Sequence, residues 1–194
     1  MTAEPPPRHR WLEQVDVLDR AAMRLLPRIR RRSLTPPLLA ITYSGSAPSW
    51  FGAALILMAL VHYEVGPVTT LRAWLACMTG SFGSLLVGEA LKRLFRRTRP
   101  YHALADHEAL GWPPPNASMP STHASTSVAL AVGLALAGDP HAGAVAAWAA
   151  LVVFSRYYTG VHYPSDLAVG AALGGAFGLL DWTWVVRAVL GAPG

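Results

Sequence analysis

The sequence predicts an all-α fold: a transmembrane helical bundle of about five spans, preceded by an amphipathic helix at the membrane interface. The composition supports this prediction, because 53% of the 194 residues are hydrophobic and only 14% are charged. The mean hydropathy of +0.33 is higher than that of an average soluble domain. Five hydrophobic stretches follow one another along the chain, and the chain length fits a single domain.

Residues 1–35 form a basic tail followed by an amphipathic helix. Residues 1–10 are rich in proline and arginine and are expected to be disordered. Apolar residues then recur with helical spacing, separated by charged residues, at Trp11, Val15, Leu18, Ala22 and Leu25. Charges at this density are costly in hydrocarbon, so we expect the helix to lie on the lipid surface; packing on the flank of the bundle is the alternative. The arginine-rich segment 28–32 is expected to bind lipid headgroups.

Residues 36–190 form the transmembrane domain. We expect its spans at residues 38–61, 68–95, 123–137, 142–159 and 165–189. The third and fourth are shorter than the roughly 20 residues that one span needs, so they extend into neighbouring loops or lie tilted. The long loop 96–122 contains three consecutive prolines, at positions 113–115, which cannot continue a helix.

Small residues recur four positions apart in two of the expected spans. They are Gly80, Ser84 and Gly88 in one span and Gly170, Gly174 and Gly178 in the other. Small residues let helices approach closely in lipid, where close packing drives association. We expect these stripes to pack within the chain; a homodimer face is the alternative.

The net charge narrows the classes of partner. A formal charge of +5 in a membrane protein favours contact with the anionic headgroups of a lipid bilayer. No basic stripe interleaved with aromatic residues is present, so no nucleic acid is expected as a partner. The single cysteine, Cys77, excludes an intramolecular disulfide.

Three polar clusters interrupt the hydrophobic stretches, at residues 92–100, 120–123 and 155–166. Taken singly, the first is explained as a positive flank that anchors a helix, and the other two as helix starts. Taken together, the first cluster ends one span, the second begins the next, and the third follows two further crossings. We therefore expect all three at one membrane surface, where they would form a single site.

The cations and helix-start donors of these clusters suit a phosphoryl group. Lys92, Arg99 and Arg156 supply positive charge, and the arginines add fork-shaped donors that match phosphoryl oxygens. At the helix start, the Ser121 hydroxyl and the free backbone N–H of Thr122 form an anion site. Such a cage can support phosphoryl transfer without a metal, and no cofactor is expected.

The two histidines have different surroundings in the sequence. His162 is followed four positions later by Asp166, about one helical turn away. A carboxylate there can fix the tautomer and stabilise the imidazolium, which makes His162 the better nucleophile. His123 is then left to protonate the leaving oxygen.

The three clusters resemble the signature of the type 2 phosphatidic acid phosphatase family, which shares its site with vanadium haloperoxidases. The family pattern is Lys, six residues, Arg-Pro; then Pro-Ser-Gly-His; then Ser-Arg, five residues, His, three residues, Asp. The chain carries this order and spacing at Lys92, Arg99, Pro100, Pro120, Ser121, His123, Ser155, Arg156, His162 and Asp166.

The resemblance implies that residues 36–190 are a lipid phosphatase domain. It implies a phosphohistidine intermediate on His162 with Asp166 supporting it, and His123 as the acid. It also implies hydrolysis without a metal and four side chains that bind phosphate: Lys92, Arg99, Ser121 and Arg156. Thr122 departs from the pattern, since it stands where the family has glycine. We expect it in the first helical turn with negative φ, where its N–H still faces the phosphate; a positive φ would strain a threonine.

The distribution of arginines predicts the side of the membrane. Five spans place the N-terminus on the same side as the site, together with most of the Lys and Arg residues. Because cytoplasmic loops carry an excess of these residues, we expect a multi-pass protein of the bacterial plasma membrane with its site on the cytoplasmic face.

The resemblance, and a site at the membrane surface, indicate a lipid phosphate as substrate. Candidates are a phosphatidylglycerol phosphate, phosphatidate, a polyprenyl diphosphate and a polyprenyl-phosphosugar phosphate. The alternatives are a lipid phosphotransferase with the same histidine nucleophile, a vanadate-dependent haloperoxidase and a non-catalytic lipid-binding protein. Haloperoxidases of this kind are typically large and soluble, and this chain is neither.

Overall fold

The structure is a computed structural model that describes residues 10–63, 65 and 68–190. Every regular element in this part of the chain is a helix, which confirms the predicted fold class. The expected disorder of residues 1–9 lies outside the described residues, and Arg10 already begins a helix. The helices are α1 (Arg10–Ile29), α2 (Thr35–Ser44), α3 (Ala47–His62), α4 (Val68–Phe95), α5 (Pro100–Ala103), α6 (Thr122–Leu136), α7 (Ala142–Tyr158), α8 (Pro164–Gly178) and α9 (Thr183–Leu190).

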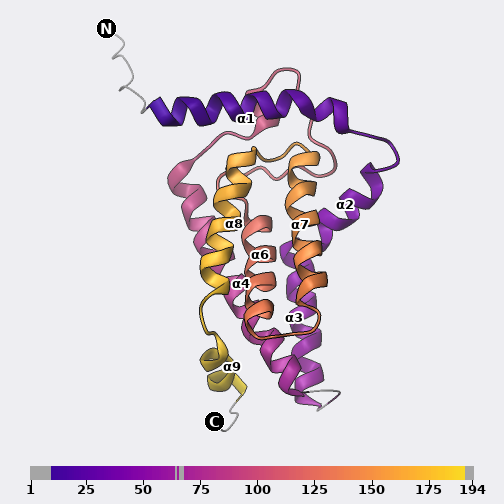
Figure 1. The fold of residues 1–194 in the computed structure, drawn as a ribbon, viewed down its shortest axis with the longest axis vertical. Helices are drawn as coiled ribbons and strands as arrows, with labels where there is room; N and C mark the ends of the chain where they lie inside the picture. Colours follow the sequence, from indigo (N-terminus) through magenta and orange to yellow (C-terminus); the bar gives the residue numbers. More distant parts are fainter. Residues whose placement is uncertain (1–9, 64, 66–67, 191–194) are drawn as a thin grey trace.

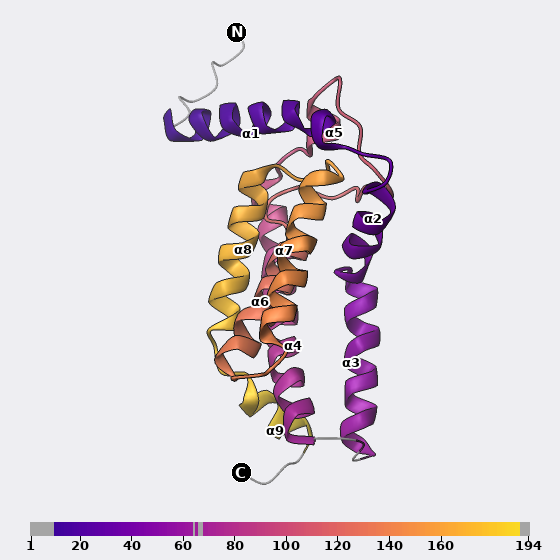
Figure 2. The same cartoon turned by 45° about the vertical axis from the view of Figure 1, so that its right-hand side comes forward.

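The helices form an elongated bundle, and α1 lies across one of its ends (Figures 1 and 2). Helix α6 is the central helix and packs against α4, α7 and α8. Helix α2 packs on α7, and α3 packs on α4. The last residues of α4 and α7 and the first residues of α6 and α8 meet beneath α1; we call this part of the molecule the α1 end.

Glycines bring α8 into direct contact with the backbone of α6. A methyl group added at Gly170, Gly174 or Gly178 would overlap a backbone carbonyl oxygen of α6. On α4, Gly88 faces the Thr122 side chain and Gly80 faces Trp182 in the same way. These glycines therefore pack within the chain, as expected, and cannot offer the alternative homodimer face.

The first expected span, 38–61, is wrong as a single helix, because α2 and α3 are separate. Pro48 lies in the first turn of α3, and its ring would clash with the carbonyl of Ser44 in a continuous helix. The backbone N–H groups of Gly45 and Ser46 instead bond to the carbonyls of Ile41 and Tyr43 and close α2. The polar residues of segment 44–49 favour this break. Averaging the hydropathy over the whole stretch 38–61 conceals it.

The last expected span, 165–189, is also wrong as a single helix. Helix α8 ends at Gly178, and α9 begins at Thr183. The Trp182 indole N–H donates to the carbonyl of Phe177 at the end of α8, and the Asp181 carboxylate accepts the N–H of Thr183. Both contacts satisfy backbone groups that a helix end leaves free, so the break is stabilised from both sides.

The N-terminal helix confirms the helical prediction but buries a different face from the expected one. Met23 and Leu26 are buried against Tyr163, whereas Leu18 is 68% exposed and Leu25 is 50% exposed. The helix therefore packs on the bundle, as in the alternative, but across its end and not on its flank (Figure 1). Its contact with a lipid surface stays a prediction.

The short third and fourth spans are confirmed as short, with 15 residues in α6 and 17 in α7. They do not extend into the neighbouring loops, so that part of the expectation is wrong. By length and composition, the described part of the chain contains one stretch able to cross a membrane alone, Leu71–Ala103. Shorter apolar helices are Ala47–Leu60, Thr122–Leu136 and Ala142–Tyr158.

The contact between α6 and α8 is testable with a pair of neighbouring glycines. We expect Gly174→Ala to destabilise the protein by about 1–3 kcal/mol, because the added methyl group overlaps the backbone of Ser125. Gly175→Ala is the matched control, since nothing lies within 4 Å of the added methyl group. Thermal unfolding in detergent measures both variants; equal unfolding temperatures would contradict the proposed contact.

Candidate active site

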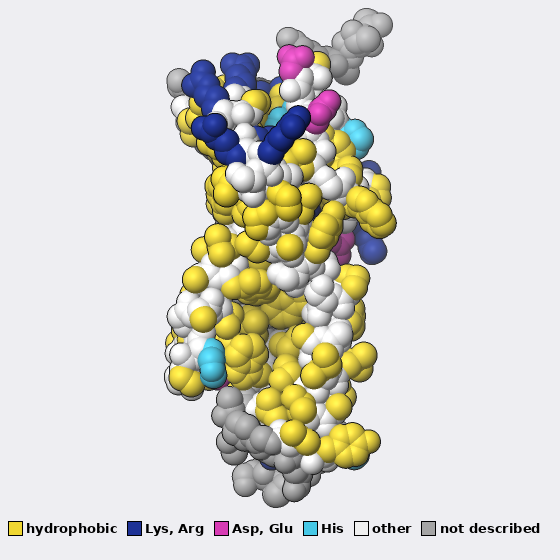
Figure 3. All heavy atoms as spheres, turned by 90° about the vertical axis from the view of Figure 1, so that its right-hand side faces the viewer, with side chains coloured by type: hydrophobic (Ala, Val, Ile, Leu, Met, Phe, Trp, Pro, Cys, Tyr) yellow, Lys and Arg dark blue, Asp and Glu magenta, His cyan; other side chains and the backbone are white. Residues whose placement is uncertain are grey.

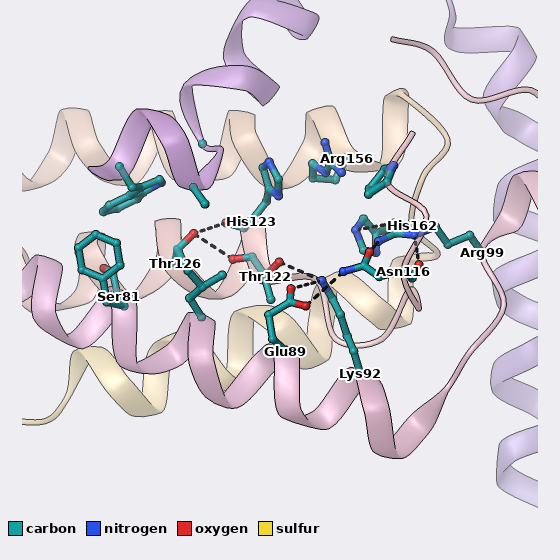
Figure 4. Close-up of a pocket in the computed structure, with 16 residues that line it drawn as sticks. Ser81, Glu89, Lys92, Arg99, Asn116, Thr122, His123, Thr126, Arg156 and His162 are labelled. Atoms are coloured by element: carbon teal, nitrogen blue, oxygen red, sulfur yellow. Dashed lines mark hydrogen bonds and ion pairs between the residues drawn. The ribbon is translucent and has the colours of Figure 1, made fainter. Parts of the chain in front are cut away.

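A cavity of about 200 Å³ lies below the α1 end. Helices α3, α4, α6 and α7, the α2–α3 junction and two loops contribute to its wall. Six of the eight site residues singled out from the sequence line it: Lys92, Arg99, Thr122, His123, Arg156 and His162 (Figure 4). The prediction that the three polar clusters converge is thus confirmed. The chemical roles given to these residues remain predictions.

The cavity has a cationic end and an apolar end. Arg99 lies at one end of the close-up and Ser81 at the other, with His123, Lys92 and Arg156 between them (Figure 4). The remaining wall includes apolar side chains from α3 and α4, namely Ala47, Trp50, Phe82 and Leu85. An anionic group with an apolar substituent therefore matches both parts of the wall.

Lys92, in the last turn of α4, is 5% exposed and reaches α6 across the cavity wall. Its Nζ donates to the Thr122 hydroxyl at 3.1 Å and to Glu89 Oε1 at 2.6 Å. The other oxygen of Glu89 accepts from the Asn116 amide at 3.2 Å. Glu89 and Asn116 both line the cavity, and the sequence analysis assigned neither of them to the site. Glu89 lies one helical turn before Lys92, a spacing that points both side chains in one direction.

Arg99 is 2% exposed and is held by the backbone of the loops around it. Its Nε donates to the carbonyl of Asn116 at 2.6 Å, and its Nη2 donates to the Asn116 side chain at 2.7 Å and the carbonyl of Ala117 at 3.1 Å. Its Nη1 donates to the carbonyl of Val161 at 2.8 Å and contacts His162 Nε2 at 3.1 Å. This arrangement fixes the guanidinium beside the imidazole.

The contact with Arg99 assigns the tautomer of His162. A guanidinium has donors only, so His162 Nε2 is the acceptor and the proton of the neutral ring lies on Nδ1. Nδ1 in turn faces Asp166 Oδ2 at 3.5 Å. Burial, together with the cations of Arg99 and Arg156, holds the pKa of this loop histidine well below its ordinary value. The His162 ring is therefore neutral at neutral pH, and its Nε2 lone pair is directed at Arg99 Nη1 in the cavity wall.

Several buried donors around the cavity have no hydrogen-bond partner among the described residues. They include Trp50 Nε1, Ser121 Oγ and Arg156 Nε. Arg156 is otherwise held through its Nη1, which donates to the Thr42 hydroxyl on α2 at 2.8 Å. Because an unpaired buried donor is costly, such a group indicates a missing acceptor. An anion in the cavity could serve as that acceptor for Arg156.

Ser121 and Asp166 belong to the site but lie behind the cavity wall. Both side chains are fully buried, and the N–H of Ser121 donates to the backbone carbonyl of Asp166 at 3.0 Å. Thr122 begins α6 and does not have a positive φ, which agrees with the expected first-turn conformation. Its methyl group lies against Gly88, so the close approach of α4 provides its space.

Asp166 is held by Arg97, which Asp19 binds in turn, and the sequence analysis left both Arg97 and Asp19 out of the site. Arg97 Nη1 donates to Asp166 Oδ1 at 2.7 Å, and Arg97 Nη2 donates to Asp19 Oδ2 at 2.6 Å. Arg97 lies in the first polar cluster, which the sequence analysis explained singly as a positive flank, and Asp19 lies in the amphipathic helix but was not singled out. A signal for Asp19 was present, since it shares a helical face with Met23 and Leu26.

The arrangement is suited to binding a tetrahedral anion between two imidazoles. Three cations line the cavity, and Glu89 is the carboxylate among the lining residues. His162 lines this space beside Arg99, and His123 lies across it on α6 (Figure 4). Within the described residues, no three His, Cys, Asp or Glu side chains gather closely enough to hold a metal ion.

Two solved structures resemble this fold closely. A transmembrane PAP2 type phosphatidylglycerolphosphate phosphatase from Bacillus subtilis gives a TM-score of 0.65 at 20% identity, covering 95% of this chain and 88% of that one. LpxE from Aquifex aeolicus gives a TM-score of 0.66 at 24% identity, covering 84% of this chain and 93% of that one. At these identities the likeness establishes the fold of a transmembrane helical bundle.

Two curated relatives are similar in sequence. Decaprenylphosphoryl-5-phosphoribose phosphatase from Mycobacterium tuberculosis is 39% identical over 113 residues, which cover 56% of this chain and 59% of that protein. Lipid A 1-phosphatase from Rhizobium etli is 35% identical over 100 residues, covering 49% of this chain and 43% of that protein. The matches thus span less than two thirds of the length of either relative.

The family assignment rests on a longer match. The sequence model of the PAP2 superfamily matches residues 71–190, which is more than half of the chain and contains all three polar clusters. This match confirms the resemblance read from those clusters. The chain belongs to the PAP2 superfamily.

Proposed function

We propose that the protein is an integral membrane phosphatase that hydrolyses the phosphate monoester or diphosphate of a membrane lipid. The observation that carries this proposal is the orientation of His162. Its ring lines the same cavity as Lys92, Arg99 and Arg156, and its Nε2 accepts a hydrogen bond from Arg99, which a phosphoryl oxygen would take over when the lone pair attacks. The same cavity continues along an apolar wall. A nucleophile beside three cations suits phosphoryl transfer, whose demands are mainly positioning and charge stabilisation.

The first step transfers the phosphoryl group to the enzyme. His162 Nε2 attacks phosphorus, the bond between phosphorus and the lipid oxygen breaks, and His123 gives its proton to that oxygen. The three cations stabilise the negative charge on the phosphoryl oxygens, and Asp166 stabilises the positive charge on the His162 ring. In the second step, water gives a proton to His123 and attacks phosphorus, and the N–P bond breaks to release phosphate.

The apolar wall supports a lipid substrate. Trp50, Phe82 and Leu85 lie beyond the phosphate-sized cationic end, where the apolar part of a substrate would continue. The relatives named for a decaprenylphosphoryl-5-phosphoribose and for lipid A point in the same direction. Among the candidates, we place a polyprenyl-phosphosugar phosphate first, ahead of a phosphatidylglycerol phosphate, phosphatidate or a polyprenyl diphosphate.

The distribution of charge supports a site on the cytoplasmic face of the bacterial plasma membrane. Lys and Arg side chains gather at the α1 end, whereas hydrophobic side chains dominate the flank of the bundle (Figure 3). The exposed arginines of this end include Arg20, Arg24, Arg28, Arg31 and Arg32. An excess of cations on one side is typical of the cytoplasmic side.

The role of His162 gives the first test of this function. We expect His162→Ala to lower phosphate release from a polyprenyl-phosphosugar phosphate at least about a thousandfold, because no other group can form the intermediate. His102→Ala, at an exposed position of the short helix α5, is the control. Phosphate release is measured against a panel of the four lipid phosphates in detergent. Full activity of His162→Ala, or no release from any lipid by the unaltered protein, would contradict the proposal.

The carboxylate of Glu89 gives a second prediction. It pairs with Lys92 and would repel an incoming phosphate. We therefore expect Glu89→Gln to lower the inhibition constant of inorganic phosphate by about three- to tenfold. Asp106→Asn, in the exposed part of the 104–121 loop, removes an equal charge and serves as the control. An unchanged or raised constant would instead show that Glu89 holds Lys92 in place for phosphate.

Cysteine labelling tests the side of the membrane. The single cysteine, Cys77, is buried, so an introduced cysteine can be followed by itself. Trp112 is 90% exposed at the α1 end, and Ala137 is exposed at the opposite end. We expect a membrane-impermeant maleimide added to intact cells to label Ala137→Cys and to leave Trp112→Cys unlabelled. The reverse pattern would place the site on the outer face.

A further inference from the structure

Asp19 is a buried carboxylate on a helix that otherwise carries its charges at the surface. It is 2% exposed and lies on the same face of α1 as Met23 and Leu26. Its Oδ1 accepts the backbone N–H of Ser165 at 3.0 Å, and its Oδ2 accepts from the Ser165 hydroxyl at 2.5 Å and from Arg97 Nη2 at 2.6 Å. Three hydrogen-bond donors therefore surround this buried carboxylate and hold it in one position.

Arg97 connects Asp19 to the site. Its guanidinium is shared between two carboxylates, with Nη2 on Asp19 and Nη1 on Asp166 Oδ1 at 2.7 Å. Nη1 also donates to the Ser165 hydroxyl at 2.6 Å, and the guanidinium carbon lies 4.2 Å from the centre of the Tyr163 ring. These contacts restrict the guanidinium at both ends and on the face that covers Tyr163.

The two oxygens of Asp166 consequently have separate partners. Oδ1 binds Arg97, whereas Oδ2 accepts the backbone N–H of Tyr163 at 2.9 Å and faces His162 Nδ1 at 3.5 Å. The oxygen that faces the histidine is therefore free of the arginine. This division depends on Asp19, because a guanidinium that lacks a second carboxylate tends to bind both oxygens of one.

We propose that Asp19 is a positioning residue for the reaction, acting through Arg97 and Ser165 to keep Asp166 Oδ2 available to His162. Helix α1 then contributes to the active site and also covers one end of the bundle. The inference rests on the proposed function, since it concerns the histidine that would carry the phosphoryl group. Without the Asp19 charge, Arg97 turns toward Asp166 Oδ2 and competes with the imidazolium for that oxygen.

Other contacts hold α1 in place and make this role separable from simple docking. The Tyr157 hydroxyl donates to the carbonyl of Ala22 at 2.6 Å, and Arg30 donates to the carbonyl of Tyr158 at 3.2 Å. The apolar contacts of Met23 and Leu26 with Tyr163 add to these. Loss of the Asp19 charge alone should therefore leave α1 packed on the bundle.

The test compares two substitutions that remove the same charge from the same helix. Asp19→Asn removes the carboxylate that binds Arg97, and Asp16→Asn removes a carboxylate that pairs only with Arg20 on the exposed side, at 2.7 Å. We expect Asp19→Asn to lower kcat for lipid phosphate hydrolysis about tenfold with KM within about twofold. Asp16→Asn should retain both constants. The burst of phosphoenzyme in rapid-quench experiments gives the concentration of active sites. The kcat is calculated per active site, so that inactive protein does not lower it.

A double substitution tests whether Asp19 acts through Arg97. We expect Asp19→Asn combined with Arg97→Gln to lower kcat no further than Arg97→Gln alone, because both changes act on the same oxygen of Asp166. Equal kcat values for Asp19→Asn and Asp16→Asn, or losses that multiply in the double variant, would overturn the inference. Should Asp19→Asn yield no folded protein, Ser165→Ala replaces it; there an unchanged kcat overturns the inference and a lowered kcat with unchanged KM supports it.

The two proposals fail in different ways. If the unaltered protein releases no phosphate from any lipid of the panel, the proposed function is wrong. If the unaltered protein is active and His162→Ala is not, but Asp19→Asn behaves like Asp16→Asn, only the inference about Asp19 is wrong.

Discussion

The contact between the backbones of α6 and α8 is the constraint on which the site depends. Gly170 and Gly174 allow α8 to lie directly on the carbonyls of Ser121 and Ser125, with no side chain between the helices. The N–H of Ser121 then reaches the backbone carbonyl of Asp166 at 3.0 Å. The starts of both helices are thereby fixed beside each other, which brings the second and third polar clusters together. On the other side of α6, Gly88 makes room for Thr122 and brings Lys92 within reach.

Electrostatics explains why the site needs residues outside the three clusters. Three buried cations around one cavity repel one another, and each is held by oxygen acceptors supplied from elsewhere in the chain. Glu89 and the Thr122 hydroxyl hold Lys92, loop carbonyls hold Arg99, and the Thr42 hydroxyl holds Arg156. Because these acceptors fix the cations before a ligand binds, a phosphoryl group would meet an organised site.

The helical fold, the extent of α4, α6 and α7 and the convergence of the clusters were predictable from local patterns. Hydrophobic stretches separated by polar clusters mark the expected membrane-spanning segments. The number of membrane crossings between two clusters then decides whether they share a side of the membrane. Two spans were predicted wrongly because an average over many residues conceals a short break, which is two residues after α2 and four residues after α8. The segments around Gly45 and Asp181 carry ordinary helix-ending chemistry, so closer attention to Pro48 could have found the first break.

The order and spacing of the three motifs can be read along the chain, and they match the family pattern. The same spacing indicates His162 as the candidate nucleophile and Asp166 as its carboxylate partner. Only the tertiary structure decided that Asp19 and Arg97 belong to the same site as Asp166, although 146 residues separate Asp19 from Ser165, which it also binds. It also decided which face of α1 is buried. The physical reason is that a charged side chain on an amphipathic helix is normally solvated, and its sequence neighbours do not show that a distant guanidinium will pair with it.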